Sequence, residues 1–402
     1  MSISVLSRIY LSVLIWHIGG AMVIPFSSIW LRSDIGEGSY LVLALVISIP
    51  NLIALFGITF VGSYTDKSKN YKVVLLFVNL VGAIEYIILT QINTSIQYLI
   101  VVAIGSLVFP AYYPIVQAYA TNLSDPGRKG EVTSKLLLNA SIGWFIGSIF
   151  AGIVYRLFGM KVILLAAAIF CIIAGILASV KTVEFNDKSI GNSKINGNDQ
   201  IDFSMDNIES TSFWNVLTRK SILSILSPVI LLDFLAGAFF ILGSVYFYEK
   251  IELSADYIGY TNAAATVFGS LILLKLGNIS DKYGRKSIYV FGLLNYPIIF
   301  LLLSIYHQPI IVLILWSIPL YAVLRPIIPA MISDVTNENE RSRGMSIVQL
   351  ASSLAMTTGA LFGGWMADTS PYGLDIWLYL PAMFGWLCPI LGYIMVKETL
   401  NM

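Results

Sequence analysis

Residues 277–286 read GNISDKYGRK, and residues 62–72 read GSYTDKSKNYK, so a polar pattern occurs twice in the chain. The shared positions are Gly62, Asp66 and Lys67 in the first copy and Gly277, Asp281 and Lys282 in the second. Further along, Tyr113-Pro114 aligns with Arg325-Pro326, and the glycines from Gly147 to Gly152 align with those from Gly359 to Gly364. Self-similarity at a fixed separation is the mark of a duplicated architecture. The sequence therefore predicts two related halves.

The composition around these stretches excludes an ordinary soluble enzyme. Of the 402 residues, 57% are hydrophobic and only 12% are charged, whereas a soluble domain carries about 25% charged residues. Lys and Arg (24) balance Asp and Glu (23), so no charge excess favours nucleic acid as a partner. Both cysteines, Cys171 and Cys388, lie in apolar runs, and there they act as small hydrophobic residues. The lipid bilayer is the expected surrounding.

Twelve apolar segments divide the chain, because a membrane helix needs about 20 mostly apolar residues. We expect spans at 9–31, 40–62, 73–92, 97–120, 133–155, 160–181, 221–248, 257–277, 287–306, 309–332, 345–367 and 376–397. Six precede and six follow one polar stretch without a sustained apolar face. The predicted organisation is an N-terminal six-helix bundle (1–181), a cytoplasmic linker (182–220) and a C-terminal six-helix bundle (221–402).

The basic residues predict the orientation, since positive loops tend to stay in the cytoplasm. Only Arg32, Arg156, Lys161 and Lys250 fall in the loops of one side, whereas the loops of the other side hold nearly all remaining Lys and Arg. We therefore expect a multi-pass protein of the cytoplasmic membrane with both termini and the linker in the cytoplasm.

In these features the chain resembles the major facilitator superfamily of secondary transporters over essentially its full length. Gly277, Asp281, Lys282, Gly284, Arg285 and Lys286 carry the most specific likeness, to the family's loop between the second and third spans of a half. The first copy keeps Gly62, Asp66 and Lys67 but lacks the internal glycine. The resemblance implies an all-α membrane fold of two pseudo-symmetric six-helix bundles, commonly monomeric, that binds small molecules at the bundle interface.

By the same resemblance, these two loops act as conformational latches. Asp66 and Asp281 would then stabilise an outward-open state through cytoplasmic contacts that break when the bundles rock. The alternative is that the neighbouring basic residues only fix the topology. Gly143, Gly147 and Gly152, together with Gly359, Gly363 and Gly364, are expected to allow close helix packing.

Four ionisable residues within the spans are candidates for coupling or substrate binding, because a charge there costs at least ~2.5 kcal/mol and usually faces a cavity or a partner. They are His17, Glu85, Asp233 and Arg325. In the family fold the first, fourth, seventh and tenth spans line the cavity, which favours His17, Asp233 and Arg325. Asp233 and Arg325 are interpreted as a buried pair that exchanges partners with substrate or proton, or as a permanent structural pair. Glu85 and His17 are either proton sites or packing residues.

Aromatic and amide side chains on the same spans complete the predicted cavity. These residues are Trp16, Tyr112, Tyr113, Gln117, Phe234, Tyr246 and Tyr321. Helical spacing of this kind is also typical of core packing, which is the alternative for each of them. With few charges in the cavity, a neutral or amphipathic organic solute is favoured.

The sequence therefore predicts a secondary active transporter of a small organic solute, working by alternating access and coupled to protons. Neither uptake nor efflux is favoured. A nucleotide-binding loop is absent from the sequence, and the spans show no carboxylate cluster for a membrane enzyme; no cofactor or metal is expected. The alternatives are a uniporter without ion coupling and a transport-silent receptor or scaffold on the same fold.

Overall fold

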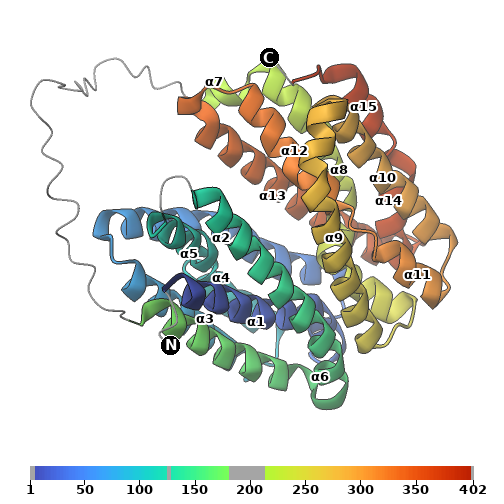
Figure 1. Cartoon of the computed structure of the whole chain (residues 1–402). Coiled ribbons are helices and arrows are strands. Elements are labelled where there is room, and N and C mark those ends of the chain that lie inside the picture. The colour runs from blue at the N-terminus through green and yellow to red at the C-terminus, as the bar shows by residue number, and fades with distance from the viewer. Residues whose placement is uncertain (1–4, 125–127, 181–212, 400–402) are drawn as a thin grey trace, which may run out of the picture.

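The computed structural model describes residues 5–124, 128–180 and 213–399, which fold into helices without a strand among them (Figure 1). The first half contains α1 (Val5–Ser33), α2 (Tyr40–Ser68), α3 (Tyr71–Leu89), α4 (Ser95–Gly105), η1 (Phe109–Ala111), α5 (Tyr112–Asn122) and α6 (Lys129–Ser179). The second half contains α7 (Phe213–Leu217), α8 (Lys220–Val245), η5 (Tyr246–Lys250), α9 (Ala255–Tyr283), α10 (Arg285–Ile305), α11 (Pro309–Trp316), α12 (Tyr321–Asp334), α13 (Glu338–Thr369), η6 (Gly373–Asp375), α14 (Ile376–Phe384) and α15 (Leu387–Met395).

Helix covers most of each of the twelve segments predicted as spans. Within the described residues, eight helices are long and apolar enough to cross a membrane, or nine when α4 and the segment Phe109–Asn122, bent by 43°, form one span. The helix α6 covers two predicted spans, and its non-helical Gly159 (φ 73°) separates them. The helix α9 and the pair α11 and α12 are helical but do not meet the same criterion. The predicted linker falls on residues outside the description up to position 212.

The polar repeats lie largely within helices that continue beyond the predicted span ends at 62 and 277. Helix α2 continues to Ser68 and α9 to Tyr283, so Asp66 and Lys67 lie in the last turn of α2. The chain then reverses within one or two residues at Lys69 (φ 53°) and Gly284 (φ 86°). Lys69 adopts the left-handed conformation common at helix ends, and its amide donates a hydrogen bond to the Thr65 carbonyl that closes α2. Gly284 combines its positive φ with an extended ψ of 145°, a conformation open mainly to glycine.

Small residues let the helices of each half approach closely. A side chain added at Gly143 or Gly147 of α6 would overlap the backbone of α1, and one added at Gly359 of α13 would overlap the backbone of α8 at Phe234. Gly147 and Gly359 occupy equivalent positions of the repeat. Close packing through small residues substitutes for the hydrophobic effect between helices in lipid.

The two halves meet through a second pair of equivalent glycines. Gly152 of α6 packs against the backbone of Ala255 at the start of α9, and Gly364 of α13 packs against the backbone of Tyr40 at the start of α2. In Figure 1 the blue-to-green and yellow-to-red halves come together where α6 and α9 lie. A Cβ at either glycine would overlap backbone atoms of the other half. The repeat therefore provides the contact between the halves twice, in pseudo-symmetric form.

Polar bonds reinforce this contact. Arg32 Nε donates to Glu249 Oε1 at 2.7 Å, and Tyr40 Oη donates to Glu249 Oε2 at 2.7 Å. Asp368 accepts hydrogen bonds from the Tyr40 and Leu41 amides and from the Ser39 hydroxyl, at 2.7–3.0 Å, and so caps α2 from the other half. At the equivalent position of the repeat, Arg156 pairs with Asp256 at 3.1 Å. We call this region, residues 32–41, 152–156, 249–256 and 364–368, the closed end.

Candidate functional site: a cavity between the halves

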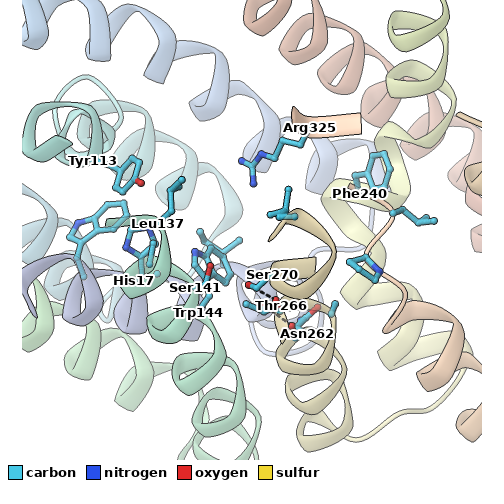
Figure 2. A pocket seen from close by; sticks show the side chains of 18 of the residues that line it. His17, Tyr113, Leu137, Ser141, Trp144, Phe240, Asn262, Thr266, Ser270 and Arg325 are labelled. Carbon is cyan, nitrogen blue, oxygen red and sulfur yellow. Dashed lines mark hydrogen bonds between the residues drawn. The ribbon is translucent and has the colours of Figure 1, made fainter. Parts of the chain in front are cut away.

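A cavity of about 960 Å³ lies between the two halves. Figure 2 shows its wall from close by. Residues of α1, α3, η1, α5 and α6 line it on one side, and residues of α8, α9, α11 and α12 line it on the other. Along α6 and α9 the lining starts beyond the closed end and extends to Leu137 and Leu273. The cavity thus runs from the closed end toward the opposite end of the bundle.

The wall on the first half is built around an aromatic cluster. The ring of Trp16 lies 4.9 Å from that of Tyr112, 5.5 Å from that of Phe109 and 4.9 Å from that of His17. His17 in turn meets the ring of Tyr113 edge-on at 5.3 Å. Trp16, His17, Phe109 and Tyr113 all line the cavity. Packed rings of this kind fix one another's orientation, so this wall is preformed.

His17 has a defined tautomer in this cluster. Its Nδ1 is 2.8 Å from the Val13 carbonyl oxygen, and because a carbonyl can only accept, Nδ1 carries the hydrogen. The other nitrogen, Nε2, is then the one available to take up a proton. His17 is the one sequence candidate for proton binding that lines the cavity.

The wall on the second half carries a polar stripe that sequence reasoning missed. Asn262, Thr266 and Ser270 follow one another at intervals of four along α9 and line the cavity (Figure 2). The Thr266 hydroxyl donates to the Asn262 carbonyl at 2.8 Å, and the Ser270 hydroxyl donates to the Thr266 carbonyl at 2.9 Å. The sequence signal was the spacing of these polar residues in an apolar helix. We assigned the lining to the first, fourth, seventh and tenth spans, and the structure adds α3, α6 and α9.

Arg325 of α12 is exposed on the cavity wall. It is the only Lys, Arg, Asp or Glu among the described residues that line the cavity. Figure 2 shows its guanidinium projecting into the space between the halves, across from Tyr113. The repeat alignment had paired these two positions, and both line the cavity.

The predicted ion pair between Asp233 and Arg325 is not present in this conformation. No bond of 4.0 Å or less joins them among the described ion pairs, and Asp233 does not line the cavity. It lies between α8 and α13, where Ser352 is its polar neighbour. The physical reason is the direction of the side chains: Asp233 lies toward α13, whereas Arg325 extends into the cavity.

Glu85 also lies away from the cavity. It is 8% exposed within the first half, and its Oε2 has no hydrogen-bond partner. A Cβ at Gly105 of α4 would overlap the Glu85 carboxyl group, so this glycine makes the room for it. Glu85 therefore occupies an interface between helices.

Four of the predicted aromatic and amide residues, whose side chains the structure describes, do not line the cavity. Tyr112 is fully buried and bonded to the Ser12 hydroxyl at 2.5 Å, and Tyr246 is buried with its hydroxyl on Asp375 at 3.2 Å. Phe234 stacks on Phe362 at 5.5 Å, and Gln117 is absent from the lining. The side chain of Tyr321 lies outside the description. Successive residues of a helix point about 100° apart, so Tyr113 enters the cavity and its neighbour Tyr112 cannot.

The latch residues lie at the opposite end from the closed end. Asp66 and Lys67 are exposed, without an ion pair in the described structure. In the second half, Arg285 pairs with Asp334 at 2.8 Å, the amides of Arg285 and Lys286 donate to Glu398, and Lys282 lies over the Tyr283 ring. The surroundings of Gly277 and the side chain of Asp281 lie outside the description. Gly62 has open space around it. The described bonds of the second latch therefore stay within its own half.

Taken together, the helical halves, their pseudo-symmetric contact and the cavity between them define a multi-pass membrane transporter fold. Comparison with known proteins agrees. Residues 10–374 match the MFS_1 like family, and the chain belongs to this family of the major facilitator superfamily. It is therefore a transporter and not an enzyme.

One curated protein and several solved structures are similar to this chain, and the solved structures reported below are transporters by title. Multidrug resistance protein 2 of Bacillus subtilis (strain 168) is 26% identical over 186 residues, and the alignment covers 46% of each protein, about half its length. The nucleoside transporter NupG superposes with a TM-score of 0.76 at 13% identity, covering 98% of this chain and 98% of that one. A bacterial homologue of the lysosomal transporter Spinster in an inward-facing conformation gives 0.74 at 11% identity, covering 97% and 96%. The xylose transporter XylE of E. coli in an inward-open conformation gives 0.71 at 16%, covering 98% and 96%.

Proposed function

We propose that this chain moves a small organic solute across the cytoplasmic membrane by alternating access, coupled to protons. The observation that carries the proposal is the cavity itself. It lies between two pseudo-symmetric halves that are bonded to each other at one end, and its lining extends toward the other. Bonds that join two rigid halves at one end can break when the halves rock about a central site.

The described conformation is proposed to be open to the cytoplasm. The end opposite the closed end carries Lys67, Lys282, Arg285 and Lys286, and basic residues favour the cytoplasmic side. The structures of XylE and the Spinster homologue, whose conformations are inward-open and inward-facing, have a similar shape. The closed end is then the outer gate.

Proton coupling is proposed to use Asp233 or His17. Asp233 is an acid within a predicted span that has no cationic partner among the described ion pairs, a position that is often a proton site in transporters. His17 contributes a free Nε2 on the cavity wall. Glu85 is proposed to be a structural group, because it lies between helices of one half.

The experiment begins with a thermal-shift screen of the purified protein against sugars, amino acids, organic acids and lipophilic cations at two pH values. A ligand that prefers the native state raises the melting temperature. Compounds that stabilise the protein are then tested for flux in proteoliposomes with and without a pH gradient.

Asp233→Asn is expected to abolish gradient-driven flux while the melting temperature stays near that of the wild type. Glu85→Gln is the matched control at a buried carboxyl group, and it is expected to keep the flux. Normal gradient-driven flux in Asp233→Asn would refute coupling through Asp233. Flux that ignores the gradient would identify a uniporter, and no flux of any stabilising compound would favour the receptor.

A further inference from the structure

We infer that the solute is an organic anion with a flat apolar body, and that Arg325 binds its charge. This inference rests on the proposed function, because it names the substrate class of the same cavity. The first observation is charge. Arg325 is exposed on the cavity wall, and none of the described ion pairs includes it. No carboxylate is among the described residues of the lining.

An unpaired guanidinium between membrane helices is costly, and its planar fork of donors matches a carboxylate. A bound anion would supply the missing countercharge. A cation would instead meet Arg325 without any acidic group on the wall to offset the repulsion.

The second observation is the surplus of hydrogen-bond donors near this charge. Trp16 Nε1 and Tyr113 Oη are buried, and each lacks a hydrogen-bond partner. Both residues line the cavity, and Tyr113 faces Arg325 across it (Figure 2). An indole N–H and a guanidinium can only donate, and a phenol hydroxyl can donate. Buried donors without partners are expensive, so this part of the wall is suited to an acceptor-rich group such as a carboxylate.

The third observation concerns the rest of the solute. Trp144 lines the cavity on the first half, and Phe240 and Trp316 line it on the second. With Trp16 and Phe109 they provide flat apolar surfaces on both sides of the space. Aromatic rings favour stacked or edge-on contact with another flat ring. An aromatic acid therefore satisfies the charge, the donors and the apolar wall together, whereas the neutral solute favoured by the sequence leaves Arg325 unpaired.

Three probes with the same ring system separate the contributions: 2-naphthylacetate, its neutral amide, and the cationic 2-(2-naphthyl)ethylammonium. Their affinities for the detergent-purified full chain are measured by isothermal titration. We expect the anion to bind at least tenfold more tightly than the amide, because hydrogen bonds to charged groups are the stronger ones, and the cation to bind more weakly than either.

Arg325→Gln is expected to lower the affinity for the anion by about tenfold or more and to leave the amide unchanged, and Arg325→Lys to fall between. Arg341→Gln, an exposed residue of α13 outside the lining, is the control that removes a positive charge elsewhere. If a thermal melt shows that Arg325→Gln fails to fold, Tyr113→Phe tests the same site. A smaller loss of affinity for the anion than for the amide in Tyr113→Phe would overturn the assignment.

Equal or tighter binding of the amide or the cation would overturn the inference, as would no binding of the anion at its solubility limit or an unchanged affinity in Arg325→Gln. The distance between spin labels on Ser68→Cys (α2) and Asn337→Cys (beside α13), both exposed, tests the proposed function separately from the substrate class. Two populated distances between them without any anion binding would refute only the substrate class. A single distance in every condition would refute alternating access.

Discussion

Glu249→Gln is expected to shift the chain from the described conformation toward one in which the closed end separates. The Glu249 carboxylate accepts from Arg32 Nε and from Tyr40 Oη, both at 2.7 Å, and so joins η5 of one half to α1 and α2 of the other. The amide keeps the shape and an acceptor oxygen but removes the negative charge. Arg32 also donates to the carbonyls of Glu37 and Gly38 at 2.6 Å, so the substitution does not leave it without partners.

The magnitude follows from the two bonds. A hydrogen bond to a charged group contributes about 1.5–3 kcal/mol and one to a neutral group about 0.5–1.5 kcal/mol, so each bond weakens by about 1 kcal/mol. The side chains of Arg32 and Glu249 are 20% and 26% exposed, and solvent screening reduces the loss. We expect about 1–2 kcal/mol in total, which is a shift of roughly 5- to 30-fold between the two conformations.

The assay is the distance distribution between spin labels on Ser68→Cys and Asn337→Cys at the opposite end. Both native cysteines are buried and do not compete for the label. The population at the shorter distance should grow in Glu249→Gln as the opposite end closes.

Lys250→Gln is the matched control, because the neighbouring Lys250 pairs with Asp375 at 2.9 Å within the same half. A distribution unchanged in Glu249→Gln, or shifted as much in Lys250→Gln, would refute the assignment of this ion pair to the gate.

Two further substitutions test the same end by independent means. Asp368→Ala removes the cap of α2 and should weaken the contact between the halves by about 0.5–2 kcal/mol. The population at the shorter spin-label distance should grow as it does in Glu249→Gln. A lower melting temperature without that growth would mean that the cap only stabilises α2. Gly152→Ala places a methyl group against the Ala255 backbone and should destabilise the described conformation by about 1–3 kcal/mol. The control is Gly130→Ala on the same helix, which has open space around it and should leave the spin-label distances unchanged. Equal effects of the two substitutions would contradict a specific close approach at Gly152.

The fold could be predicted from the sequence because its two determinants are local. Apolar runs of span length determine where helices form in lipid, and the repeat pairs Gly152 with Gly364 and Tyr113 with Arg325. The predicted spans end at polar residues, whereas the helices α2 and α9 continue beyond them, with Asp66 and Lys67 in the last turn of α2. Break points within helical segments, such as Gly159, depend on single glycines with a positive φ.

The site was predicted less completely, because facing within a bundle is a property of tertiary packing. The sequence identified Trp16, His17, Tyr113 and Arg325, which line the cavity. It did not distinguish Tyr113 from Tyr112, which hydrogen-bonds Ser12 in the core. It also missed the stripe on α9, since Asn262, Thr266 and Ser270 are uncharged and attract attention only when their common direction is known.

The tryptophans of the cavity make the protein its own optical sensor. Three of the eight tryptophans in the chain, Trp16, Trp144 and Trp316, line the cavity. Two belong to the first half and one to the second, so their emission depends both on what occupies the space and on how far apart the halves stand. Solute entry and rocking can then be followed in real time by intrinsic fluorescence of the unmodified chain in a native-like bilayer. Replacing one tryptophan at a time by phenylalanine would separate the two signals.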